Sequence, residues 1–251
     1  MKRRTNFLTE NDCYKAARPL KPTGILVHST GVNQKRIGPY TSQWNRPGVQ
    51  VCVHGFLGLD GDGELCYEQI LPYSMRCWGC GSGSLGSYNA THIQFEICED
   101  ITDRRWLHTT YDAAKEICRE LCLQYGIDPA NVVTHSEAHA TGYASNHADV
   151  MHWWPIEGLD MDRFRKELRE ELKDEMENND KNYAVFKAFM ARYEAEQRAL
   201  PPSDYAAESC RKGVASGLFT DGSGDGSIDW PHAYLKRQEL AVLMDRRGEL
   251  D

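Results

Sequence analysis

The chain has 251 residues, of which 41% are hydrophobic and 26% charged, and its formal net charge is -8 at pH 7. This composition is typical of a globular protein, and the length allows one domain of ordinary size with a small second one. A net negative charge argues against nucleic acid as a partner, because phosphate binding needs a basic surface.

The start of the sequence predicts synthesis in the cytoplasm without a signal peptide. Residues 1–13 begin with basic side chains, but no apolar segment follows them, as a secretion signal would require. No apolar run further along is long enough to cross a membrane. We therefore expect no membrane insertion, and any export would use another route.

The first 135 residues are expected to form strands joined by loops, with one long helix. Apolar runs and period-two alternation predict the strands, and apolar residues at three- and four-residue spacing predict the helix. In chain order, we expect a strand at 23–28, a polar loop at 31–48, strands at 49–59 and 64–70 around an Asp-Gly turn, a glycine-serine loop at 78–88, a strand at 91–98, a helix at 111–125 and a strand at 131–134.

Two of these strands lead to a histidine, His28 and His135. A rigid scaffold can aim a side chain at a strand end into a cleft, and adjacent strands would bring the two imidazoles within reach of one metal ion. Asp149 follows fourteen residues after His135, beside His147. Imidazole and carboxylate are the ligands that a catalytic zinc prefers. The alternative is that these are ordinary hydrogen-bonded histidines, and HSEAH lacks the spacing of the helical HExxH zinc motif.

The strand at 91–98 carries an acid among otherwise neutral side chains. Period-two alternation places Glu96 on one face with His92, Gln94 and Cys98, while the other face is apolar and packs under helices. An acid on an inner strand is costly unless it is paired or functional. Glu96 is therefore expected to face a cleft.

Two further motifs in this region are interpreted as structural. Gly81, Gly83 and Gly86 match GxGxxG, but a dinucleotide fingerprint needs a strand before it and a helix after it. We interpret this loop as a flexible cleft wall. Cys77 and Cys80 form a CxxC pair without a second pair, so the nine cysteines are expected to be reduced and structural, with a disulfide as the alternative.

Five blocks in this order (VHST, THIQFEICED, the helix after it, VVTHSEAH and SNHADVMHWW) resemble the zinc-dependent N-acetylmuramoyl-L-alanine amidases of the amidase-2 family, which includes the peptidoglycan-recognition proteins. The resemblance covers about residues 5–156 and is nearest to amidases of clostridial phages and their hosts. It implies an α/β fold with a mixed central β-sheet flanked by helices, followed by a small all-helical C-terminal region.

The resemblance also implies roles for individual residues. His28 and His135 match the two histidine ligands of zinc, and Asp149 matches the third, with His147 as the alternative ligand. Glu96 matches the acid implicated as general base, and His147 then serves as the group that stabilises the oxyanion. Substrate-binding residues are expected among the side chains of the cleft: His54, Trp78 and Asn89. Relatives often carry a histidine in place of Gly79 and a tyrosine in place of Val53.

The second half of the sequence suggests attachment rather than chemistry. Residues 159–200 carry many charges of both signs and apolar positions at helical spacing, interrupted at 178–180, and predict a helical pair or one helical connector. Residues 201–251 resemble a single S-layer-homology-like repeat, with helices expected at 204–217 and 235–247. The loop from Asp221 to His232 spaces its acids like an EF-hand but has histidine where a bidentate glutamate is needed, which argues against calcium.

These observations predict three parts: a zinc amidase domain at 1–158, a connector at 159–200, and a wall-binding or oligomerisation module at 201–251. The expected function is hydrolysis of the amide bond between N-acetylmuramic acid and L-alanine in peptidoglycan, at the bacterial cell wall, by an endolysin or autolysin. The expected partner is the muramyl peptide, and the C-terminal helices are candidates for homodimerisation. The alternative function is a non-catalytic peptidoglycan-binding module, which would usually have lost a ligand.

Overall fold

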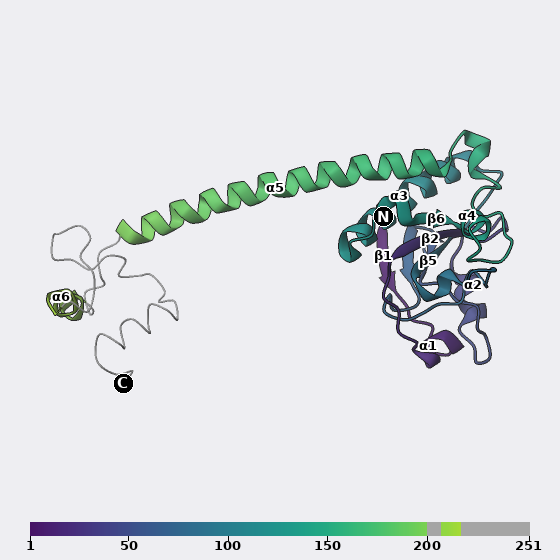
Figure 1. The fold of residues 1–251 in the computed structure, drawn as a ribbon, viewed down its shortest axis with the longest axis horizontal. Helices are drawn as coiled ribbons and strands as arrows, with labels where there is room; N and C mark the ends of the chain where they lie inside the picture. The colour runs from purple at the N-terminus through teal and green to yellow at the C-terminus, as the bar shows by residue number, and fades with distance from the viewer. Residues whose placement is uncertain (200–206, 217–251) are drawn as a thin grey trace. The chain divides into compact units, whose positions relative to one another are not determined.

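The computed structural model describes residues 1–199 and 207–216 (Figure 1). The chain divides into two units, Met1–Glu175 and Met176–Asp251. The first unit contains the sheet. Of the second unit, the structure describes the end of one long helix and the short helix α6 (Ala207–Ala215).

A mixed six-stranded sheet forms the centre of the first unit, which confirms the expected fold class. All neighbouring strands are parallel except the β3–β4 pair, which is antiparallel around the predicted Asp-Gly turn. Across the sheet the order is β1 (Lys2–Thr5), β4 (Leu65–Gln69), β3 (Gly55–Leu59), β5 (His92–Ile97), β2 (Gly24–Ser29) and β6 (Val132–Thr134).

One face of the sheet is covered by α3 (Arg104–Tyr125). The apolar side chains of β5 pack with Ile117 and Leu121 of this helix in one buried cluster, as the alternation in β5 predicts. The helix begins earlier than expected because the Asp103 side chain accepts a hydrogen bond from the Trp106 amide and caps it. It ends, as expected, at Gly126, whose φ of 66° suits glycine.

The predicted polar loop at 31–48 is wrong over part of its length, because it contains α2 (Gly38–Trp44). Tyr40 and Trp44 lie on one side of this helix and both contact the ring of Phe56, with ring centroids 5.3 and 5.0 Å apart. This packing against β3 stabilises a helix that local propensity does not suggest. The remaining short helices are α1 (Asp12–Ala16), α4 (His135–Ala140) and the 3-10 turns η1 (Tyr88–Ala90), η2 (Pro129–Asn131) and η3 (Trp154–Glu157).

Two strands differ from their predicted extents. The predicted strand at 49–59 is shortened to β3, and residues before it contribute only an isolated bridge between Cys52 and Trp78. The edge strand β1 was not predicted, because all four of its side chains are exposed and it carries no apolar alternation.

The long helix α5 (Met161–Ala199) is continuous, so the alternative of a helical pair is wrong. Its first turns belong to the core of the first unit: Met161, Phe164 and Leu168 are buried there, and Leu172 packs against them. The first unit therefore extends past residue 158, where the catalytic domain was expected to end. The reason is that Phe164 stacks on Trp154 and meets Tyr111 edge-on.

The structure describes only part of the region to which the C-terminal predictions apply. Helix α6 falls inside the helix expected from 204 to 217. The candidate calcium loop from Asp221 to His232 and the second helix of the S-layer-like repeat lie outside the described residues. Among the helices of the described ranges, none has both the length and the apolar character needed to span a membrane.

Candidate metal centre

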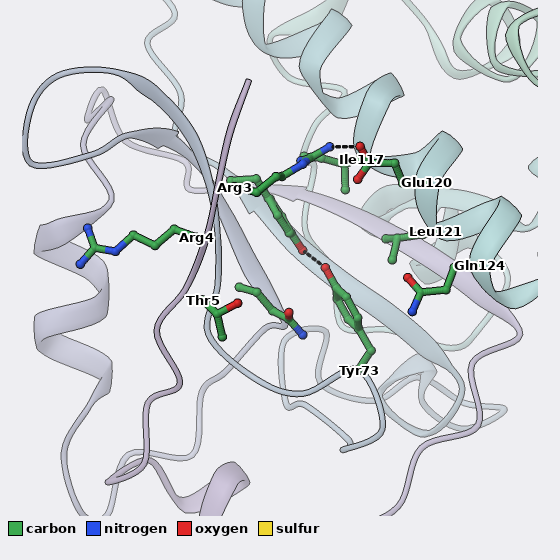
Figure 2. Close-up of a pocket in the computed structure, with 10 residues that line it drawn as sticks. Arg3, Arg4, Thr5, Tyr73, Ile117, Glu120, Leu121 and Gln124 are labelled. Atoms are coloured by element: carbon green, nitrogen blue, oxygen red, sulfur yellow. Dashed lines mark hydrogen bonds and ion pairs between the residues drawn. The ribbon is translucent and has the colours of Figure 1, made fainter. Parts of the chain in front are cut away.

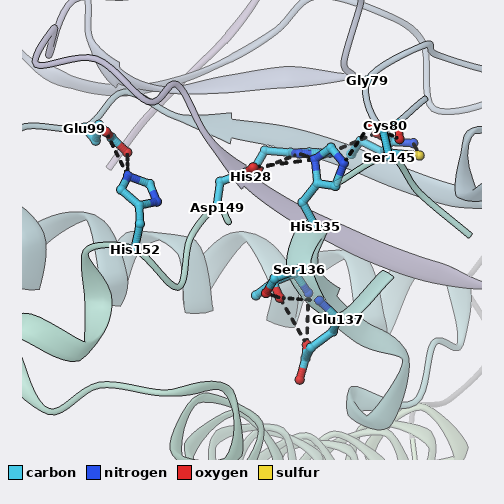
Figure 3. Close-up of polar contacts among 12 residues, drawn as sticks. His28, Gly79, Cys80, Glu99, His135, Ser136, Glu137, Ser145, Asp149 and His152 are labelled. Carbon is cyan, nitrogen blue, oxygen red and sulfur yellow. Dashed lines mark hydrogen bonds and ion pairs between the residues drawn. The ribbon is translucent and has the colours of Figure 1, made fainter. Parts of the chain in front are cut away.

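Three side chains predicted as zinc ligands converge at one edge of the sheet (Figure 3). His28 lies near the end of β2 and His135 follows β6, and these two strands are adjacent and parallel, so their carboxyl ends meet. Asp149 reaches the same point from a loop. The Nδ1 atom of His28 is 3.1 Å from Nδ1 of His135 and 2.9 Å from Oδ2 of Asp149, and Oδ1 of Asp149 is 3.6 Å from Nδ1 of His135.

A capping box sets the direction of His135. The Thr134 side chain accepts a hydrogen bond from the Glu137 amide, and the Glu137 side chain accepts one from the Thr134 amide, so α4 begins immediately after β6. Arg165 of α5 donates to the Glu137 carboxylate at 3.0 Å. The chain therefore turns sharply at the strand end and points the first residue of the helix, His135, at His28.

The donor set fits a zinc ion. Two imidazole nitrogens and a carboxylate, with candidate ligand atoms all within 4.8 Å of one another and all three residues buried, are typical of a catalytic zinc site with a position left for water. Burial lowers the pKa of His28, but the hydrogen bond to Asp149 and the charge of Glu96 outweigh it and raise that pKa. Burial by itself would raise the pKa of Asp149. The hydrogen bonds from His135 and His28 outweigh this effect, so the pKa of Asp149 lies well below its usual range.

Asp149, and not His147, completes this group. His147 is exposed, and its ring lies against that of His135 with centroids 4.7 Å apart. It is outside the set of converging ligand atoms. The structure therefore supports the first of the two alternatives for the third ligand and leaves His147 beside the centre.

Glu96 is in position to act on a group held at this centre. It pairs with His28 in the register of the parallel strands β5 and β2. It is partly buried, and its Oε2 atom is shielded from solvent with no hydrogen-bond partner among the described residues. Burial is the main cause that raises the pKa of Glu96, to about 7. A carboxyl group with these properties is typical of a general base.

His54 is not a substrate-binding residue in this structure. It is fully buried. Its Nδ1 accepts a hydrogen bond from the Gln94 amide at 2.9 Å, and its Nε2 donates to the Met75 carbonyl at 2.8 Å. Because both ring nitrogens are used inside the protein, the histidine connects β5 to the segment at Met75 and cannot contact a ligand.

Asn89 is likewise occupied internally, which corrects its predicted role. Its Oδ1 accepts hydrogen bonds from the amides of Gly79 and Cys80, at 3.0 and 3.2 Å, and its Nδ2 donates to the Gly81 carbonyl at 2.9 Å. The residue is buried. It therefore organises the loop and is not exposed to substrate.

Trp78 is 41% exposed and lines a surface cavity of about 320 Å³ with Cys13 and Arg18. A second cavity, of about 280 Å³, lies beside α3, between Arg3, Tyr73 and Leu121 (Figure 2). Neither cavity is lined by a residue of the metal centre. Of the three predicted substrate-binding residues, only Trp78 thus remains accessible.

The glycine-serine loop is attached to the loop at 142–145 rather than free. The amide of Leu85 donates to the Gly142 carbonyl at 2.8 Å, and the amide of Ser145 donates to the Cys80 carbonyl at 2.9 Å. A Cβ at Gly83 would lie 2.3 Å from the Gly142 carbonyl oxygen. The glycines therefore permit close approach of two loops, and the prediction of a flexible cleft wall does not agree with these contacts.

Two polar residues at the centre were not predicted as site residues from the sequence. Gln94 and Ser145 each contact the outer nitrogen of one histidine, at 3.0 and 3.3 Å. The sequence carried a signal only for Gln94, which shares a strand face with Glu96. A further pair of polar residues is hydrogen-bonded: Nε2 of His152 is 3.0 Å from Oε1 of the buried Glu99 (Figure 3).

Residues 18–151 match the family Amidase_2, described as N-acetylmuramoyl-L-alanine amidase. Because this match covers more than half of the chain, the protein belongs to that family. A comparison with curated proteins finds no match.

Solved structures share the fold. The Staphylococcus aureus hydrolase AmiA in complex with its ligand aligns with a TM-score of 0.54 and 19% identity, over 70% of this chain and 85% of that one. The PlyG catalytic domain aligns with a TM-score of 0.52 and 24% identity, over 68% and 96%. A mutant endolysin from Bacillus subtilis aligns with a TM-score of 0.50 and 21% identity, over 67% and 99%.

Proposed function

We propose that this protein is a zinc-dependent amidase that hydrolyses the bond between N-acetylmuramic acid and the L-alanine of the peptidoglycan stem peptide. The observation that carries the proposal is the convergence of His28, His135 and Asp149 beside an unpartnered carboxylate oxygen of Glu96. Family membership and the ligand-bound hydrolase among the structural neighbours support peptidoglycan as the substrate class.

A zinc ion at this centre would supply Lewis-acid chemistry, polarising the scissile carbonyl and lowering the pKa of a water toward ~7. Glu96 takes the proton that the attacking water loses and returns it to the leaving amine. His147, exposed beside His135, donates a hydrogen bond to the developing oxyanion, a contribution worth about 3 kcal/mol per donor in other enzymes.

Metal content and bond specificity test this proposal together. Purified protein should contain about one zinc per chain and release stem peptides from cell walls by cutting the muramyl amide. His28→Ala should lose both metal and activity. His108→Ala is the matched control, because His108 is an exposed histidine of α3 that contacts Glu157 and no ligand. Zinc-free parent protein that binds muramyl peptide without cleaving it would instead support the non-catalytic binding module.

The biological setting is part of the proposal. Action at the bacterial cell wall, as an endolysin or autolysin of clostridial phage or host type, is supported by the resemblance of the sequence blocks and by an endolysin among the structural neighbours. Wall attachment through the S-layer-like residues 201–251 is proposed on their sequence alone.

Self-association through α5 is proposed on the pattern of its exposed side chains. Met176, Tyr183, Phe186 and Tyr193 are large apolar residues that are between 48% and 61% exposed within the part of the helix that the structure describes. Their separations of seven, three and seven residues place them on one seam, as at the a and d positions of a coiled coil. A second copy of the same helix, with the same seam, is the proposed partner.

A further inference from the structure

The outer nitrogens of the two histidine ligands are both held by the glycine-rich loop, through different side chains. A histidine can offer Nδ1 to a metal only when that nitrogen carries no proton, and the hydrogen bond made by Nε2 decides which nitrogen is protonated. The orientation of each Nε2 partner is therefore important for the ligand set.

The orientation of the Gln94 side chain, the partner of His28, is determined by backbone amides. The amides of Gly79 and Cys80 both donate to one atom of Asn89, which must therefore be its oxygen, Oδ1. The same Oδ1 accepts a hydrogen bond from Nε2 of Gln94 at 3.0 Å. With its nitrogen turned to Asn89, Gln94 can only present Oε1 to His28, 3.0 Å away. Nε2 of His28 must then carry a proton, so Nδ1, which lies 2.9 Å from Oδ2 of Asp149, is the nitrogen left to bind a metal ion.

The orientation of the Ser145 hydroxyl, the partner of His135, is determined by one carbonyl group. The hydroxyl of Ser145 donates its single proton to the Cys80 carbonyl, at 3.1 Å. Its oxygen can then only accept from Nε2 of His135, 3.3 Å away. Nδ1 of His135, which faces His28 and Asp149, is then the nitrogen left to bind a metal ion.

We propose that the segment Gly79 to Gly81 is the scaffold that fixes both histidine ligands in the Nε2-protonated form, through the positioning residues Gln94 and Ser145. The inference rests on the proposed zinc site. It assigns a structural function to the GxGxxG-like loop, which contacts Asn89 and Ser145. It also explains why Gly81 is glycine: a Cβ there would lie 2.9 Å from Oγ of Ser145.

Zinc affinity and ring-proton signals test the proposal in the full-length protein. Ser145→Ala and Gln94→Met each remove one acceptor and should weaken zinc binding, measured by competition with a chelator, by about 10- to 100-fold. In histidine ¹⁵N spectra of the zinc-loaded protein, Ser145→Ala should abolish the protected Nε2–H signal of His135 alone, and Gln94→Met that of His28 alone.

Matched controls separate positioning from general damage. Ser136→Ala makes the same chemical change next to His135, but the Ser136 hydroxyl contacts Thr134, so zinc affinity should stay within about twofold of the parent. Gly81→Ala should weaken zinc binding by displacing Ser145. Gly63→Ala introduces the same kind of backbone strain, at a φ of 83°, where a Cβ meets nothing within 4 Å, and should leave zinc binding unchanged.

The outcomes are distinguishable. A parent protein that binds no zinc would overturn the proposed function and this inference with it. A parent that binds zinc while Ser145→Ala and Gln94→Met bind it equally well would overturn the inference alone. So would loss of both Nε2–H signals in either single variant, because that result means general unfolding of the centre. If Gln94→Met does not fold, Ser145→Ala and Gly81→Ala, which change a partly exposed contact, still decide the matter.

Discussion

Glu96 stands beside His28 in the register of the parallel strands β5 and β2. Both side chains project to the same face of the sheet, because residues paired across neighbouring strands share a face. The opposite face of β5 packs against α3. The candidate base and a candidate ligand are thus positioned by backbone hydrogen bonds of the sheet rather than by a loop.

This relationship gives a prediction for Glu96. Glu96→Gln should keep the fold and the bound zinc, because the side chain has the same shape and Glu96 is not among the converging ligands, while kcat falls by a factor on the order of 10² to 10⁴. Turnover on a soluble muramyl peptide and metal analysis of the same preparation check it. Turnover close to that of the parent would remove Glu96 from the mechanism and direct attention to Glu99.

His54 predicts how stability depends on pH. Burial lowers the pKa of His54 to about 4, below its unfolded value of about 6.5, so the folded state binds fewer protons. Its contribution is complete above pH 6.5 and is lost as the pH falls toward 4, at most about 3 kcal/mol. Urea unfolding of metal-free protein at pH 7.5 and pH 5 measures the part of this loss that falls above pH 5, about 2 kcal/mol.

The control for that experiment compares how strongly the free energy of unfolding depends on pH in the parent and in a His54 variant. Burial also lowers the pKa of His92 to about 4, so this residue adds to the effect with the same sign. His54→Asn should remove only its own share of the pH dependence, whatever it costs in stability at neutral pH. An identical change between the two pH values in parent and His54→Asn would contradict the assignment.

The core contacts of α5 predict where the chain can be shortened. A chain ending at Glu157 loses Phe164 and Leu168 and uncovers the fully buried ring of Trp154, so it should aggregate. A chain ending at Glu175 keeps these contacts and should bind zinc and hydrolyse a soluble muramyl peptide. Phe164→Ala in the full chain should cost about 3–5 kcal/mol. A stable, active chain ending at Glu157 would show that α5 is dispensable for the core.

Shortening also tests wall attachment. The chain ending at Glu175 should bind whole cell walls about 10²-fold more weakly than the full chain if residues after it supply a second contact. Sedimentation with intact walls measures this independently of turnover. Equal wall binding by the two chains would exclude the anchoring role of the C-terminal part.

The exposed seam of α5 predicts a dimer, and a single charged side chain placed in this seam should disrupt it. Phe186→Glu should convert a dimer to a monomer in sedimentation velocity, because it places like charges opposite each other in an apolar seam. Val185→Glu is the matched control: Val185 is a neighbouring residue that is 70% exposed but lies off the seam. A monomeric parent, or equal loss of the dimer in both variants, would contradict self-association through this seam.

Several features of the site could be predicted because they depend on local pattern. A strand that ends at a polar residue places that residue at the sheet edge, and this located His28 and His135. Period-two alternation placed Glu96 opposite the apolar face that meets α3. Each of these inferences needs only the few residues on either side, and each expected position was found.

Other features required contacts between residues far apart in the sequence. Nothing local distinguishes His54, which is buried with both nitrogens bonded, from a histidine in a cleft. Helix α2 forms in a polar segment because Tyr40 and Trp44 meet Phe56. Ser145 carries no pattern at all, and it matters only because its hydroxyl lies between the Cys80 carbonyl and His135.

The sequence by itself determined which residue types stand at the strand ends and on the polar face of β5, and so which residues are candidate ligands and which is the candidate base. The tertiary structure decided which of them meet. Asp149 rather than His147 joins the two histidines, and the orientation of Gln94 is set through Asn89 by amides of Gly79 and Cys80. The physical reason is that side-chain direction at a strand end follows from local backbone geometry, whereas hydrogen-bond partners depend on how separate loops pack together.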